Sequence, residues 1–197
     1  MRTTLAATPP RPARRVRGPD GLLLLLGLLA AACGSGSEPA AVEVPVGTGV
    51  GNRAPPLQGM LSSQEEFRLE PAGAARTVLV FYRSADCGLC RVQMEQLQEN
   101  LAAYDRADAR VVAVTLDPPE VSSRLADSAA LAFPIASVDS ATFRQWDALD
   151  DGRGVPQPAS YIIDSTGIVL YRYIGRNAAD RATDADLVAV LEVLASE

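Results

Sequence analysis

The chain has 197 residues, of which 48% are hydrophobic and 21% charged, and its formal net charge is −6. An acidic surface repels phosphate backbones, which argues against nucleic-acid binding. The chain contains no histidine, so a histidine-activated nucleophile and a metal site with histidine ligands are both excluded.

The first 32 residues have the pattern of an export signal. Four arginines lie between positions 11 and 17, and the apolar run that follows at 21–32 is too short to span a membrane as a helix. Three alanines close this run directly before Cys33, an arrangement that resembles the cleavage site of bacterial lipoproteins. We therefore predict a signal peptide over 1–32 and lipidation at Cys33. Plain secretion, with Cys33 discarded or left in a free tail, is the alternative.

The segment after the signal has the composition of a linker. Residues 33–50 are rich in Gly, Val, Ser and Pro, and we predict that the lipidated cysteine is followed by a flexible tether. Residues 51–197 are long enough for one domain with one core. The sequence therefore predicts a lipid-anchored domain at the cell membrane that faces the periplasm or the cell exterior.

Strands and helices alternate along this domain. Runs of β-branched and apolar residues predict strands at 77–82, 110–116, 133–138, 160–164 and 168–173. Helical periodicity predicts helices from 87 onward and at 120–131, 140–149 and 183–195. The alternation implies parallel pairing, and a turn at 164–167 joins the last two strands as a hairpin. We therefore predict an α/β fold with a mixed central sheet flanked by helices.

The same patterns predict which helix residues face the core and which cap the helices. In the helix that begins near position 87, Val92 is predicted to lie on the buried face and Gln93 on the polar face. Ser140 is predicted to cap the helix that follows it, and either Thr183 or Asp184 to cap the last helix.

Cys87 and Cys90 follow the first predicted strand, at the first turn of a predicted helix. Unpaired N–H groups and the positive end of the helix dipole stabilise a thiolate at such a position. Arg83 and Arg91 add positive potential beside the pair, and Asp86 opposes it. The three-residue spacing lets the sulfurs form a disulfide. We therefore predict that Cys87 is the exposed nucleophile and that Cys90 resolves the mixed disulfide.

Two other roles compete for this cysteine pair. A zinc site needs two further ligands, and the chain has neither histidine nor another spare cysteine. A structural disulfide is the stronger alternative because an exported protein lies in an oxidising compartment. The loop that it would close is very short, so it would constrain the unfolded chain little.

Residues 81–90, with the sequence FYRSADCGLC, resemble the active-site segment of AhpC/TSA-type redoxins. This peroxiredoxin-like branch of the thioredoxin superfamily is close to the TlpA-like thiol–disulfide proteins. Residues 51–55 match its Gly-x-x-Ala-Pro opening, and 154–167 resemble its Gly-x-Pro…Ile-Asp-x-x-Gly segment. The resemblance covers 51–197. It implies a thioredoxin-like fold and an enzyme that is a thiol–disulfide oxidoreductase or a thiol-dependent peroxidase.

The resemblance also implies a substrate-binding element. Pro158 falls where thioredoxins carry a cis-proline. Gln157 and Pro158 would then face the cysteines, and the Gln157 backbone would pair with an incoming peptide. An ordinary trans proline in a loop is the alternative.

The peroxidatic position is open between the two cysteines. Ser84, three residues before Cys87, mimics the hydroxyl-x-x-Cys pattern of peroxiredoxins and makes Cys87 the peroxidatic residue. An ungapped alignment instead places that residue at Cys90. In either register Pro158 replaces the family arginine, and Phe81 replaces the buried carboxylate of thioredoxins. The missing arginine counts against peroxide reduction, which needs hydrogen-bond donors around the O–O bond.

Three functions follow from these observations. The leading hypothesis is exchange between the Cys87–Cys90 pair and protein thiols or disulfides, with a membrane or periplasmic thiol reductant as electron donor. The second is a peroxiredoxin-like peroxidase that reduces a small hydroperoxide. The third is a redox-inert binding protein that keeps the fold with a structural disulfide. No cofactor and no metal is expected in any of them.

Overall fold

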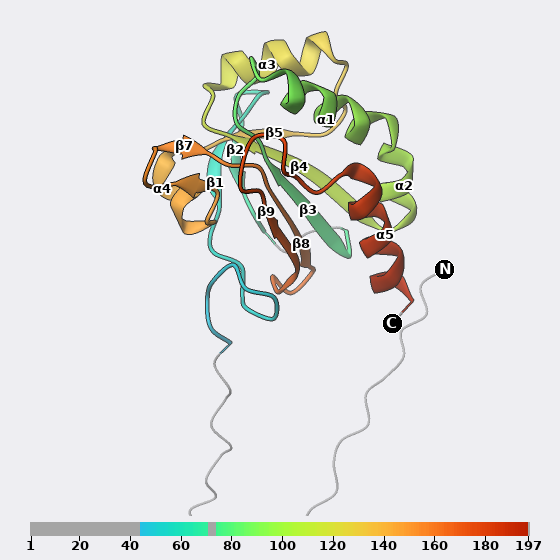
Figure 1. Cartoon of the computed structure of the whole chain (residues 1–197). Helices are drawn as coiled ribbons and strands as arrows, with labels where there is room; N and C mark the ends of the chain where they lie inside the picture. The colour runs from blue at the N-terminus through green and yellow to red at the C-terminus, as the bar shows by residue number, and fades with distance from the viewer. Residues whose placement is uncertain (1–43, 71–73, 197) are drawn as a thin grey trace, which may run out of the picture. The chain divides into compact units, whose positions relative to one another are not determined.

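The computed structural model describes residues 44–70 and 74–196, and the predictions for 1–32 and for Cys33 fall outside these residues. The described residues form nine strands and five helices (Figure 1). The strands are β1 (Gln58–Leu61), β2 (Glu66–Arg68), β3 (Arg76–Phe81), β4 (Ala109–Thr115), β5 (Ile135–Ser137), β6 (Leu149–Asp150), β7 (Val155–Pro156), β8 (Ala159–Asp164) and β9 (Val169–Ile174). The helices are α1 (Gly88–Glu99), α2 (Leu101–Arg106), α3 (Pro119–Ser128), α4 (Ser140–Gln145) and α5 (Asp184–Ala195). None of these helices is long and apolar enough to cross a lipid bilayer.

Seven strands form one sheet in the order β2-β1-β5-β4-β3-β8-β9, and β6 pairs separately with β7. The central strands β3, β4 and β5 run parallel. β8 pairs antiparallel with β3 and turns into the antiparallel β9. The predicted α/β fold, with a mixed central sheet flanked by helices, is therefore confirmed.

The central strand β3 supplies side chains to a core on each face of the sheet. Val78 and Val80 belong to an apolar cluster with side chains of α1, α3 and α5. The alternate residues Leu79 and Phe81 belong to a second cluster with Phe143 of α4. Figure 1 shows α1 and α5 on one side of the sheet and α4 on the other. Because β3 is buried on both faces, the loop that follows it starts from a fixed position.

An aromatic cluster surrounds the end of β3. The ring centroid of Phe81 lies 5.2 Å from that of Phe143, 5.5 Å from that of Trp146 and 5.7 Å from that of Tyr161. The first and third contacts are edge-to-face, a favourable geometry for aromatic pairs. Phe81 therefore packs among aromatic rings, and its side chain offers no proton acceptor beneath the cysteine loop.

The hairpin of β1 and β2 was not among the predicted strands. Its strands are short, and the first contains Gly59, a residue that is unfavourable in strands. A side chain at Gly59 would place its Cβ 2.2 Å from the Ser137 carbonyl oxygen. Glycine is therefore required where β1 approaches β5, and this packing requirement overrides the local preference.

Residues 44–50, predicted to be part of the tether, are bonded to the domain. The backbone N–H of Gly47 donates to the Arg53 carbonyl at 2.9 Å. The Thr48 hydroxyl donates to the Asp147 carboxylate, and Thr48 is buried. Residues 47 and 48 are therefore tied to the folded domain by hydrogen bonds.

The predicted buried face of α1 is wrong at two neighbouring positions. Val92 is 49% exposed, whereas Gln93 is 3% exposed. The Gln93 amide is hydrogen bonded on both sides, donating to the Ala182 carbonyl at 3.2 Å and accepting from Arg181 at 2.8 Å. A buried polar group with both partners in place does not have the usual penalty of desolvation.

The predicted cap of α4 is one residue away from the observed one, and the observed cap of α5 is one of the two residues predicted. α4 is capped by Asp139 rather than Ser140, because the Asp139 carboxylate accepts from the Thr142 backbone N–H at 2.8 Å. α5 is capped by Thr183, one of the two predicted alternatives, and Asp186 completes a capping box.

Candidate active site

The cysteine pair lies at the junction between β3 and α1. Cys87 is the residue that caps the N-terminus of α1, and its carbonyl accepts from the backbone N–H groups of Cys90 at 2.9 Å and Arg91 at 3.0 Å. The backbone N–H of Cys87 donates to the Ser84 carbonyl at 3.2 Å. This strand-to-helix junction is where the sequence placed the pair.

The two thiols differ in access. Both cysteines are free thiols; Cys87 is half-buried, whereas Cys90 has no exposed surface. Cys90 packs in the core cluster with Met94, and Cys87 lies at the edge of the same cluster. A partner can therefore reach Cys87 but not Cys90.

The surroundings shift the acidity of the two thiols in opposite directions. Burial opposes ionisation of Cys87, but the side chain and backbone of Cys90 and the guanidinium of Arg181 outweigh burial and lower the pKa of Cys87. Burial raises the pKa of Cys90, and the neighbouring Cys87 raises it further. The first proton to leave the pair at rising pH therefore comes mainly from Cys87.

Arg181 is a site residue that the sequence analysis missed. It lies between β9 and α5, more than 90 positions beyond Cys87. Its Nη1 donates to the Leu89 carbonyl at 3.1 Å, inside the Cys-x-x-Cys segment. No motif marks Arg181, and only the packing of α5 beside α1 brings it to the pair.

Asp117 is a second residue that the sequence analysis left out of the site. Its Oδ2 accepts a 2.6 Å hydrogen bond from the backbone N–H of Ala85, two residues before Cys87. Its own backbone N–H donates to the Thr115 hydroxyl at 3.1 Å. Asp117 follows β4, and the carboxyl ends of parallel strands meet at one edge of a sheet. That rule is the signal that would have found it.

The predicted supporting residues differ in what they contact; they are Arg83, Ser84 and Arg91. Ser84 contributes its backbone carbonyl to the cysteine loop, as described above. Arg83 is exposed and lines a cavity of about 80 Å³ together with Gln157. Arg91 donates to the Ser128 hydroxyl of α3 at 3.4 Å. The charged side chain that lowers the pKa of Cys87 is thus Arg181 rather than either predicted arginine.

The backbone of Gln157, predicted to pair with an incoming peptide, is partly hydrogen bonded within the domain. Its backbone N–H already donates to the Ala148 carbonyl at 2.8 Å. Pro158 is buried, and its carbonyl accepts from the Gly175 N–H at 2.8 Å. The Gln157 N–H is therefore already bonded to Ala148, the residue before β6, and only the Gln157 carbonyl is left for an incoming strand. The cavity shared with Arg83 still places Gln157 beside the cysteine loop.

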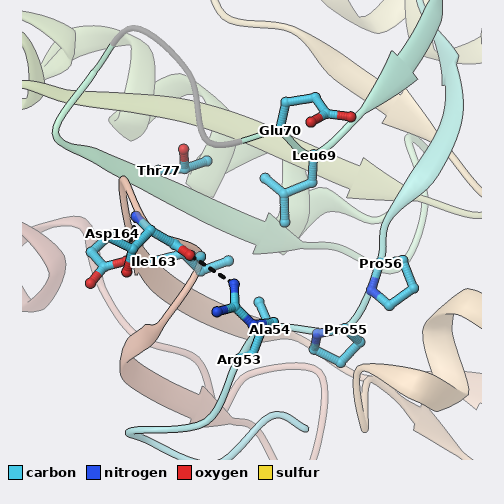
Figure 2. Close-up of a pocket in the computed structure, with 11 residues that line it drawn as sticks. Arg53, Ala54, Pro55, Pro56, Leu69, Glu70, Thr77, Ile163 and Asp164 are labelled. Atoms are coloured by element: carbon cyan, nitrogen blue, oxygen red, sulfur yellow. Dashed lines mark hydrogen bonds between the residues drawn. The ribbon is translucent and has the colours of Figure 1, made fainter. Parts of the chain in front are cut away.

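A larger hollow lies on the other side of the cysteine loop, between α1 and α3. Its volume is about 300 Å³, and its lining includes Asp86, Arg91 and Arg124. A further cavity, of about 150 Å³, lies at the opposite edge of the sheet, where Arg53 donates to the Thr166 carbonyl at 3.0 Å (Figure 2). Thr77, at the start of β3, lines this second cavity, whereas the cysteines follow the end of the same strand. The cavity is therefore separated from the cysteines by the length of β3.

A mixed sheet with a Cys-x-x-Cys pair where a central strand meets a helix defines a thiol protein of the thioredoxin fold. Residues 50–172 match the AhpC/TSA family, which is more than half of the chain. The chain belongs to the AhpC/TSA family. It is a thiol-dependent redox enzyme, either a thiol–disulfide oxidoreductase or a thiol-dependent peroxidase.

Known proteins and structures agree with this assignment. The chain is 24% identical over 102 residues to alkyl hydroperoxide reductase E of Mycobacterium tuberculosis, which covers 50% of this chain and 67% of the relative. A peroxiredoxin-like protein from Aquifex aeolicus superimposes with a TM-score of 0.67 at 20% identity, over 77% of this chain and 96% of that structure. Peroxidoxin BcpB from Mycobacterium tuberculosis gives a TM-score of 0.64 at 18% identity, over 77% and 99%. The predicted thioredoxin-like fold is therefore confirmed.

Proposed function

We propose that this protein is a thiol–disulfide oxidoreductase in which Cys87 is the nucleophile and Cys90 the resolving cysteine. One observation carries the proposal: Cys87, at the N-cap position of α1, has an accessible thiol with a lowered pKa, and a second thiol, with a raised pKa, is buried one turn along the same helix. This difference decides which sulfur attacks first, because the thiolate is the nucleophile.

The reaction proceeds in two exchanges. The Cys87 thiolate attacks one sulfur of a partner's disulfide, forms a mixed disulfide and releases the partner's other sulfur as a thiolate, which takes up a proton. The Cys90 thiol then loses its proton and attacks the Cys87 sulfur, which releases the partner's second thiol. Two electrons pass from the dithiol to the partner, and the Cys87–Cys90 disulfide is reduced again by a dithiol donor.

A peroxidase is the second candidate, and the relatives favour it. Those described above are named alkyl hydroperoxide reductase, peroxiredoxin-like protein and peroxidoxin. In this reaction the Cys87 thiolate attacks the terminal oxygen of a hydroperoxide and becomes a sulfenic acid. The O–O bond breaks, and the alkoxide that leaves takes up a proton to become the alcohol. Cys90 then attacks the Cys87 sulfenic acid, and water is released as the disulfide forms. Burial of Cys90 supports Cys87 as the peroxidatic residue in this case.

The proposed place of action is the outer face of the cell membrane. The apolar run at 21–32 followed by Cys33 supports a lipid anchor. A full chain with Cys33→Ala should move from the membrane fraction to the soluble fraction of its host. Continued membrane association of that variant would argue against the anchor.

The test of the activity uses one preparation and two electron acceptors. The reduced full chain, with dithiothreitol as donor, is assayed for reduction of insulin disulfides and for consumption of hydrogen peroxide and cumene hydroperoxide. We expect insulin reduction that is lost in Cys87→Ser, and a stable mixed disulfide with insulin in Cys90→Ser. Peroxide consumption without disulfide exchange would replace the first candidate by the second. Inactivity toward both acceptors would argue against both candidates.

A further inference from the structure

The guanidinium of Arg181 is fixed at the first two turns of α1 by bonds on several sides. Nη1 is shared between the Leu89 carbonyl at 3.1 Å and the Gln93 Oε1 at 2.8 Å, and Nη2 donates to the Ala178 carbonyl. Leu89 lies between the two cysteines in the chain. Bonds to the carbonyl of Leu89 and to the next turn therefore hold the positive charge against the segment that carries both sulfurs.

Gln93 makes this arrangement specific. Its side chain is 3% exposed, and its two polar atoms have different partners: Oε1 accepts from Arg181, and Nε2 donates to the Ala182 carbonyl at 3.2 Å. Because an amide has one acceptor end and one donor end, these partners fix its orientation. Gln93 thus ties α1 to two consecutive residues of the segment before α5.

We propose that Arg181 holds Cys87 in the thiolate form and that Gln93 positions Arg181 for this role. The inference rests on the proposed function, in which Cys87 is the nucleophile. A guanidinium keeps its charge at any pH at which the protein works, and its attraction for a thiolate is strong where water is partly excluded. The lowered pKa of Cys87, to which Arg181 contributes, is in agreement.

Arg181 also supplies a guanidinium that the family pattern would place elsewhere in the chain. The family arginine that would precede β8 is replaced here by Pro158, which is buried and bonded through its carbonyl to Gly175. Arg181 brings a guanidinium to the cysteines from a different segment of the chain. The positive charge of the site is thus supplied from beyond β9.

Stabilising the Cys87 thiolate has a redox consequence. Because the thiolate belongs to the reduced state, a group that stabilises it favours the dithiol over the disulfide and makes the pair more oxidising. Loss of Arg181 should therefore shift the reduction potential of the Cys87–Cys90 pair to a more negative value. A residue that only tied the segment before α5 to α1 would not have this effect.

The test measures the thiol itself. In the reduced full chain with Cys33→Ala, the alkylation rate of Cys87 is followed from pH 5 to 10 by mass spectrometry of its peptide. In Arg181→Gln we expect the rate at pH 6 to fall by about 3- to 10-fold, with the same plateau at high pH, since the thiolate fraction falls tenfold for each unit by which pH lies below the pKa. Arg181→Lys should retain most of the rate. Arg68→Gln, an exposed charge-matched control on β2, should leave it unchanged.

Two results would overturn the inference. One is a pH midpoint of Cys87 alkylation in Arg181→Gln that equals that of the parent. The other is a loss of alkylation rate in Arg181→Lys as large as in Arg181→Gln, with a lower plateau at high pH, which would indicate a structural role. Gln93→Met leaves the charge of Arg181 in place but removes the hydrogen bond that positions it. This variant should shift the pH midpoint of Cys87 in the same direction as Arg181→Gln, but by less. The titration needs no turnover, so an inactive parent protein with an acidified Cys87 would refute the proposed function and leave this inference standing.

Discussion

The Asp117 carboxylate accepts a 2.6 Å hydrogen bond from the backbone N–H of Ala85. This contact joins the end of β4 to the loop between β3 and α1. It connects the central sheet with the buried residue Ala85, which precedes Cys87 by two positions. Asp117 therefore acts on the position of the nucleophile without touching its sulfur.

We expect Asp117→Ala to loosen this loop. The buried N–H of Ala85 would lose a charged acceptor, which typically costs about 1–3 kcal/mol. Urea unfolding should show a loss of this size, and insulin reduction should slow by a larger factor than stability alone explains. Asp117→Asn keeps an acceptor at the same place and should lose less. Equal loss in both variants would show that the hydrogen bond is not what matters at this position.

The sequence was informative where local pattern and tertiary structure agree. The run at 77–82 predicted β3 because every one of its apolar residues is buried, and Thr183 predicted the start of α5 because its cap is made with Asp186, three positions away. The Cys87–Cys90 pair could be placed for the same reason: a strand followed at once by a helix fixes its surroundings locally.

The sequence failed where partners far along the chain decide the outcome. Gln93 is polar and was predicted to be exposed, but its partners Arg181 and Ala182 lie almost 90 positions away. Gly59 weakens a strand locally, yet it is needed where β1 meets β5. Arg181 and Asp117 were missed as site residues for the same reason, since only the packing of α5 and the order of the sheet bring them to the cysteines.

A buried tyrosine and carboxylate support the packing of α5 on α2. The Tyr104 hydroxyl donates to the Asp184 Oδ1 at 2.6 Å, and Asn100 donates to Oδ2 at 2.7 Å. Tyr104→Phe should lower the free energy of unfolding by about 1.5–3 kcal/mol, the usual size for a hydrogen bond to a charged group. Tyr82→Phe is a matched control, because the Tyr82 hydroxyl has no hydrogen-bond partner among the described residues. A similar loss in both variants would contradict this explanation.

The cap of α5 makes a separate prediction. The Thr183 hydroxyl and backbone bond to Asp186 at the helix start, two residues after Arg181. Thr183→Ala should cost about 1 kcal/mol, the usual value for loss of a capping side chain. Thr183→Ser retains the hydroxyl and should be close to neutral. Thermal unfolding of the two variants measures the difference, and equal melting temperatures would show that the cap contributes nothing.

The opposite pKa shifts of the two thiols make the final prediction. The lowered pKa of Cys87 means that its thiolate forms below the usual range for cysteine and is lost as pH falls through that lowered value. Cys90, with a raised pKa, should react only at higher pH.

Replacing Cys90 tests the part of the Cys87 pKa shift that comes from the Cys90 thiol. Cys90→Ala removes the hydrogen-bond donor to Cys87 and should move the pH midpoint of Cys87 alkylation upward, whereas Cys90→Ser keeps a hydroxyl donor and should move it less. An unchanged midpoint in Cys90→Ala would mean that the helix start and Arg181 account for the acidity of Cys87 without help from its neighbour.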